Sequence, residues 1–196
     1  MTRRSLALCV ALGLLPGLAW AHSPIKGLDN FYAGLLHPVF VPAHLLSILV
    51  LGVLLGQQGA QRVQVAIVAC LVALLVGLAA SVPAAEISVE VPLLAFAAVS
   101  GALVALARPL PVPAIAALGG VVTLLVGVDS AQEGLSGRGW LAAMLGSAIA
   151  AYLLLLYAMV FAEWFGRREW QRIGLRILGS WAAASALLVL SLALRG

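Results

Sequence analysis

The sequence predicts an all-α, polytopic integral membrane protein, with about six transmembrane helices after a cleavable N-terminal signal peptide. Hydrophobic residues make up 64% of the chain and charged residues only 9%. The mean hydropathy is +1.14, well above the balance of a soluble domain. The breaks between the apolar runs are short and rich in Gly, Pro or charge, so we expect no soluble domain.

The start of the chain has the layout of a signal peptide. Two arginines precede an apolar core, and an A-x-A cleavage site ends at Ala21. Residues 1–21 are therefore the expected leader, and residues 22–196 a single six-helix transmembrane domain. Cleavage would leave His22 as the N-terminal residue, whose amine and imidazole can chelate copper or nickel. The alternative is that His22 is merely the first residue after the cut.

Each apolar run after the leader approaches the ~20 residues that a helix needs to cross a bilayer. The expected spans cover residues 30–56, 63–82, 91–107, 112–128, 140–165 and 173–194. The segments that separate them, in order, read QQGAQR, VPAAEISVE, RPLP, DSAQEGLSGRG and GRREWQR. All of these contain residues that end or interrupt apolar helices.

The charges predict how the spans are oriented. If the leader carries the N-terminus outward, the loops after the first, third and fifth spans are cytoplasmic. Those loops and the adjoining helix ends carry Arg62, Arg108, Arg167, Arg168, Arg172 and Arg176, in agreement with the positive-inside rule. We expect a multi-pass protein of a bacterial inner membrane with a periplasmic mature N-terminus. The net charge of +4 is explained by this asymmetry, so nucleic-acid binding is not expected.

The same orientation places most of the acidic residues at the outer side, namely Asp29, Glu86, Glu90, Asp129 and Glu133. Acidic groups gathered there would attract cations. The alternative is that they are solvated loop ends. Asp129 and Glu133 would share a face if the helix continued through them, and could then hold a divalent cation together with imidazoles. The alternative, equally open, is that Asp129 begins a turn, which the glycines and serine that follow make plausible.

Two of the three histidines lie on the first expected span, in the stretch HPVFVPAH. An imidazole in hydrocarbon is costly unless it faces a protein partner, a water-filled cavity or an ion. On a straight helix His37 and His44 would share a face roughly 10 Å apart along the axis, too far to bind one ion without a kink. Pro38 and Pro42 could supply that kink, because each removes an amide donor and frees a carbonyl one turn earlier.

The stretch FYAGLLHPVFVPAHLLSILVLGVLLGQ resembles the first helix of the HupE/UreJ family of nickel and cobalt permeases, which carry an H-x5-D-H motif. His37 and His44 match its histidines, and Ala43 stands where the family has aspartate. The family's second motif, F-H-G-x-A-H-G-x-E, aligns with LVGVDSAQE, in which Val126 and Ser130 replace the two histidines. The stretch PAAEISVEVPLLAFAAVSGALVAL also resembles the third span of the family.

The resemblance implies a permease that takes a divalent transition metal, such as nickel, cobalt, copper or zinc, inward from the periplasmic side. The expected polar set is His22, Asp29, His37, His44, Glu90, Asp129 and Glu133. The alternative is a non-transporting membrane subunit or accessory metal-binding protein on the same scaffold, with a membrane protein partner or a second copy. A membrane metalloenzyme is a weaker third hypothesis, because no substrate pocket or general acid follows from spacing. We therefore expect no enzymatic activity.

Overall fold

A computed structural model of the chain describes residues 30–81, 88–130 and 134–194. This part of the chain consists of seven α-helices and has no strand, which confirms the all-α prediction. The helices are α2 (Asn30–Phe40), α3 (Pro42–Gln58), α4 (Gln64–Ala80), α5 (Glu90–Leu106), α6 (Val112–Val128), α7 (Gly137–Phe165) and α8 (Glu169–Ala193). The predicted leader and its cleavage site lie outside the described residues.

The first expected span is two helices rather than one. α2 and α3 meet at an angle of 71°. Val41 between them has an extended backbone (φ −90°, ψ 107°), and Pro42 occupies the first turn of α3. A proline fits the first turn of a helix because no donor is needed there, and it disfavours a helical conformation in the residue before it. The sequence HPVFVPAH therefore breaks the span at Val41.

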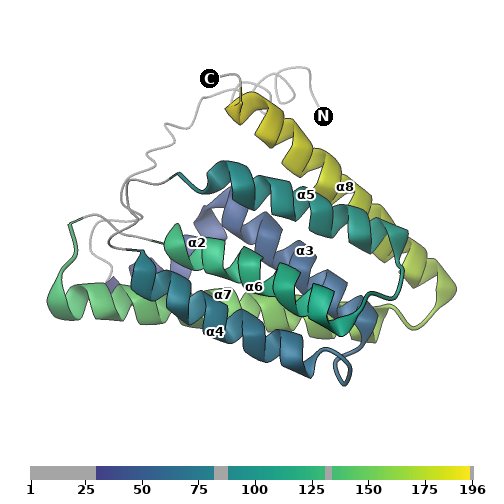
Figure 1. Ribbon diagram of the computed structural model, residues 1–196, viewed down its shortest axis with the longest axis horizontal. Helices are drawn as coiled ribbons and strands as arrows, with labels where there is room; N and C mark the ends of the chain where they lie inside the picture. Colours follow the sequence, from purple (N-terminus) through teal and green to yellow (C-terminus); the bar gives the residue numbers. More distant parts are fainter. Residues whose placement is uncertain (1–29, 82–87, 131–133, 195–196) are drawn as a thin grey trace, which may run out of the picture.

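α3 is the central helix of the bundle. It packs against α7 and α5, while α2 lies along α7, α4 along α6, and α8 along α5 (Figure 1). Leu51, Leu54 and Leu55 in the middle of α3 are fully buried. α8 buries only Leu175, Gly179 and Ala186, so most of its surface is available to lipid.

Glycines allow the close approach of the helices that carry the polar residues. A Cβ atom at Gly34 of α2 would overlap the carbonyl oxygen of Ala143 in α7, and one at Gly146 would overlap the carbonyl oxygen of Phe31. A Cβ at Gly127 of α6 would lie 2.6 Å from the carbonyl oxygen of Leu74 in α4. Small residues at such crossings are typical of membrane helices, whose association depends on close packing.

Helix length supports a membrane protein but does not establish six spans. α7 and α8, with 29 and 25 residues, are each long and apolar enough to cross a bilayer, and the bent pair of α2 and α3 is a third candidate. α4, α5 and α6 are apolar helices of 17 residues each. Each is about 25 Å long, somewhat short of a hydrocarbon core of about 30 Å. The count of six spans therefore stays a prediction.

Side-chain contacts identify the two ends of the bundle. At one end His44 of α3 meets Asp129 after α6. At the other end, the amide of Ala60 after α3 donates to Glu163 near the end of α7. Most of the arginines lie at this second end: Arg62, Arg108, Arg167, Arg168, Arg172 and Arg176. We call it the arginine end, and the opposite end the histidine end.

Candidate metal site

The bend between α2 and α3 brings the two histidines together. The centroids of the His37 and His44 rings are 5.3 Å apart, and the ring planes are inclined by 72°. The separation of roughly 10 Å expected on a straight helix does not apply, because the segment is bent by 71°. The kink that the prolines made possible is present, and it places two imidazoles from different turns beside one another.

A hydrogen bond from a neighbouring helix replaces the donor that Pro38 lacks at this bend. Pro38 has no N–H to give to the carbonyl of Gly34, and the hydroxyl of Ser147 in α7 donates to that carbonyl at 3.0 Å. Across the break, the amide of Val41 donates to the carbonyl of His37 at 3.1 Å. The prediction that a proline frees a carbonyl one turn earlier is confirmed for Pro38. The bend is thus held by a neighbouring helix as well as by local geometry.

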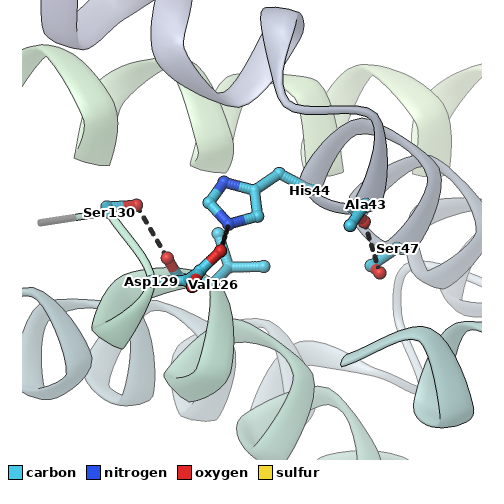
Figure 2. A network of polar contacts seen from close by, with 6 residues as sticks. All are labelled: Ala43, His44, Ser47, Val126, Asp129 and Ser130. Atoms are coloured by element: carbon cyan, nitrogen blue, oxygen red, sulfur yellow. Dashed lines mark hydrogen bonds and ion pairs between the residues drawn. The ribbon is translucent and has the colours of Figure 1, made fainter. Parts of the chain in front are cut away.

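His44 is fully buried at the histidine end. Its side chain is 0% exposed, and its Nε2 lies 2.8 Å from Oδ2 of Asp129, whose side chain is 30% exposed. Figure 2 shows the imidazole reaching from α3 to the carboxylate that follows α6. Ala43 has no carboxylate, so the acid beside His44 comes from a distant part of the chain.

Asp129 is placed by the end of α6. The helix ends at Val128, and the amide of Asp129 donates to the carbonyl of Leu125 at 2.9 Å. Ser130 turns back toward the helix, because its hydroxyl donates to the carbonyl of Val126 at 2.7 Å (Figure 2). α6 therefore ends before Asp129, as the turn alternative expects, and Glu133 lies outside the described residues.

Two ring nitrogens at the site have no hydrogen-bond partner among the described residues. They are Nε2 of His37 and Nδ1 of His44, and both are buried. A neutral imidazole nitrogen with a free lone pair is a ligand for zinc, copper, nickel or cobalt. When two imidazoles bind one tetrahedral ion, their ring centroids lie about 5 Å apart. The observed spacing fits such a pair.

The other predicted site residues do not join this pair. Glu90 is the exposed first residue of α5. His22, Asp29 and Glu133 lie outside the described residues. Within residues 30–81, 88–130 and 134–194, no three His, Cys, Asp or Glu side chains are grouped to hold one ion. The described site is therefore two imidazoles with one carboxylate hydrogen-bonded to the second.

Ser147 is a supporting residue that the sequence does not single out, since a serine in an apolar membrane helix is typical of a packing position. The absence of an N–H in Pro38 signals that the carbonyl of Gly34 needs another donor. The sequence does not indicate which helix supplies that donor. The hydrogen bond from Ser147 shows that α7 does.

A family model described as HupE / UreJ protein matches residues 10–189, nearly the whole chain. The chain belongs to the HupE/UreJ family. Searches of curated proteins and of solved structures found no match. For this HupE/UreJ protein, family membership and the apolar helices support a membrane protein of metal-transporter type.

Proposed function

We propose that this HupE/UreJ protein is a permease for a divalent transition metal, with nickel, cobalt, copper and zinc as the candidate ions. One observation carries the proposal: the imidazoles of His37, which is partly buried, and His44, which is fully buried, lie 5.3 Å apart at a helix break, and each has a buried nitrogen without a partner among the described residues. Polar groups are expensive in a membrane interior, and those that occur there often mark the pathway of an ion or substrate. Imidazole ligands favour borderline transition metals over magnesium or calcium.

The proposed direction is inward, across a bacterial inner membrane that the chain spans six times. The arginine end would face the cytoplasm, following the positive-inside rule. The histidine end, with Asp129 and Glu90, would then face the periplasm, together with the cleaved N-terminus. A metal ion arriving from that side would meet acidic groups before it met the imidazoles.

α3 supports a path between the two ends of the bundle. Its stretch from His44 to Gln57 corresponds to about 20 Å of helix. At the arginine end, Gln57 and Glu163 are among the residues that line a pocket of about 430 Å³. The carboxylate of Glu163 is the acidic group of this pocket, which makes it a candidate point of release. The sequence contains no Gly-rich nucleotide-binding loop, so we propose secondary or channel-like transport.

One observation favours the accessory alternative. Leu51, Leu54 and Leu55 are 0% exposed and occupy the middle of α3. In this conformation they separate the histidine end from the pocket at the arginine end. Transport therefore requires α3 or its neighbours to move, whereas a metal-binding accessory subunit requires no such movement.

Metal accumulation in cells tests the proposal. We expect cells that express the wild-type chain to accumulate at least one of nickel, cobalt, copper and zinc, and His37→Ala or His44→Ala to reduce this to the level of empty cells. Val39→Ala is a matched control, because Val39 lies on the same segment with an exposed side chain. Unchanged accumulation of all four metals in the wild type and both histidine variants would refute the permease. Metal binding without accumulation, together with a co-purifying membrane protein, would favour the accessory subunit.

A further inference from the structure

The hydrogen bond between His44 and Asp129 determines which nitrogen of His44 is free. An ionised carboxylate only accepts hydrogen bonds, so Oδ2 of Asp129 requires a proton on Nε2 of His44. The imidazole is then neutral if Nδ1 carries a lone pair. Nδ1 has no hydrogen-bond partner among the described residues. The favoured tautomer therefore has its lone pair on Nδ1.

One oxygen of the Asp129 carboxylate is engaged by His44. Oδ2 of Asp129 is already bound to His44 at 2.8 Å. The backbone of Asp129 is anchored to α6 through the carbonyl of Leu125. In metal sites, a carboxylate that accepts the remote N–H of a histidine ligand fixes its tautomer and ring orientation and raises its basicity. The hydrogen bond from Nε2 of His44 to Oδ2 of Asp129 is a contact of this kind.

We propose that Asp129 is a positioning residue for the metal site, one that presents Nδ1 of His44 beside Nε2 of His37 without binding the ion itself. This inference rests on the proposed function, since it assigns a role at the same site. It revises the sequence-based expectation that Asp129 is one of the ligands. Among the described residues it leaves two neutral nitrogen ligands for the preferred ion.

The ligand set predicts selectivity among divalent ions. The two imidazole nitrogens that the described part of the site offers suit cobalt, nickel, copper or zinc. Manganese and magnesium prefer carboxylate, carbonyl and water oxygens. If Asp129 were a direct ligand, the mixed nitrogen and oxygen set would also bind manganese. Competition between cobalt and manganese therefore separates a positioning role from ligation.

Calorimetric titration of the purified full-length protein with Co²⁺ and with Mn²⁺ tests the assignment. We expect Asp129→Asn to bind Co²⁺ within about threefold of wild type, because the amide oxygen still accepts from Nε2. Asp129→Ala should bind one Co²⁺ per chain about 10- to 100-fold more weakly, the range found when a supporting carboxylate is removed. Glu169→Gln, an exposed acid at the opposite end of the bundle, is the control and should leave the affinity unchanged.

A spectroscopic measurement separates positioning from simple misfolding. Pulsed EPR of bound Cu²⁺ should count two imidazoles in wild type and still two in Asp129→Ala, but one in His44→Ala. The inference is wrong if Asp129→Asn abolishes binding as completely as His44→Ala, or if wild type binds Mn²⁺ through Asp129. It is also wrong if Asp129→Ala leaves Co²⁺ affinity unchanged, a result that would leave the permease proposal intact. Absence of Co²⁺ and Cu²⁺ binding by wild type would overturn both.

Discussion

Replacing Ser147 by alanine should destabilise the bundle through the bend in the first span. The hydroxyl of Ser147 is the donor to the carbonyl of Gly34, and both residues are buried. Pro38 cannot supply an intrahelical donor, so Ser147→Ala leaves this carbonyl without one. Leaving a buried acceptor unpaired costs about 1–3 kcal/mol in proteins generally. Interhelical hydrogen bonds in membranes average about 0.6 kcal/mol with a maximum near 1.7.

We therefore expect Ser147→Ala to lower the free energy of unfolding by about 1–1.5 kcal/mol, measured by reversible unfolding in mixed detergent micelles. Ser47→Ala is the matched control. Ser47 is equally buried, but its hydroxyl donates to the carbonyl of Ala43 in its own helix. That carbonyl already has a backbone partner one turn later, so the loss should stay below about 0.5 kcal/mol. Equal losses in the two variants would refute the role given to Ser147.

Three further results are expected. Gly127→Val should lower the thermal unfolding midpoint markedly because a side chain there meets the backbone of α4, whereas Gly120→Ala, with only ordinary contact at 3.9 Å, should not; equal midpoints would contradict the packing argument. Glu163→Gln should reduce cellular cobalt accumulation roughly threefold or more while Co²⁺ affinity of the purified protein is unchanged; a matching loss of affinity would place Glu163 in binding rather than release. In a cysteine-free background, a membrane-impermeant thiol reagent should label Ser136→Cys but not Gln61→Cys in spheroplasts; the reverse pattern would invert the proposed orientation.

The apolar runs, and the glycines, prolines and charged residues that separate them, predict most of the helices. The expected spans 112–128 and 140–165 correspond to α6 (Val112–Val128) and to most of α7 (Gly137–Phe165). These two span predictions agree with the structure because prolines, glycines and charged residues end apolar runs regardless of tertiary packing. The break at Val41 is different. Pro38 and Pro42 predict that a kink is possible. The 71° bend also involves α7, in which Ser147 donates a hydrogen bond to α2 and Gly146 leaves room for its backbone.

The sequence predicts the candidate site only in part, because the site also depends on contacts between distant segments of the chain. His37 and His44 are visible in the sequence as buried imidazoles that need a partner. Asp129 is visible as an acid at the same end, but its pairing with one nitrogen of His44 joins residues 85 positions apart. Whether a carboxylate binds the ion or orients a ligand depends on such a contact. No spacing rule along one helix can distinguish these roles.

Radioactive cobalt flux into proteoliposomes tests the central claim most directly, because it separates transport from binding. The wild-type protein should carry Co²⁺ into vesicles well above protein-free vesicles, and the double variant His37→Ala/His44→Ala, reconstituted to the same density, should not exceed that background. Flux that is equal in the wild type and the double variant would contradict the account, since the two imidazoles would then be unnecessary for passage of the ion.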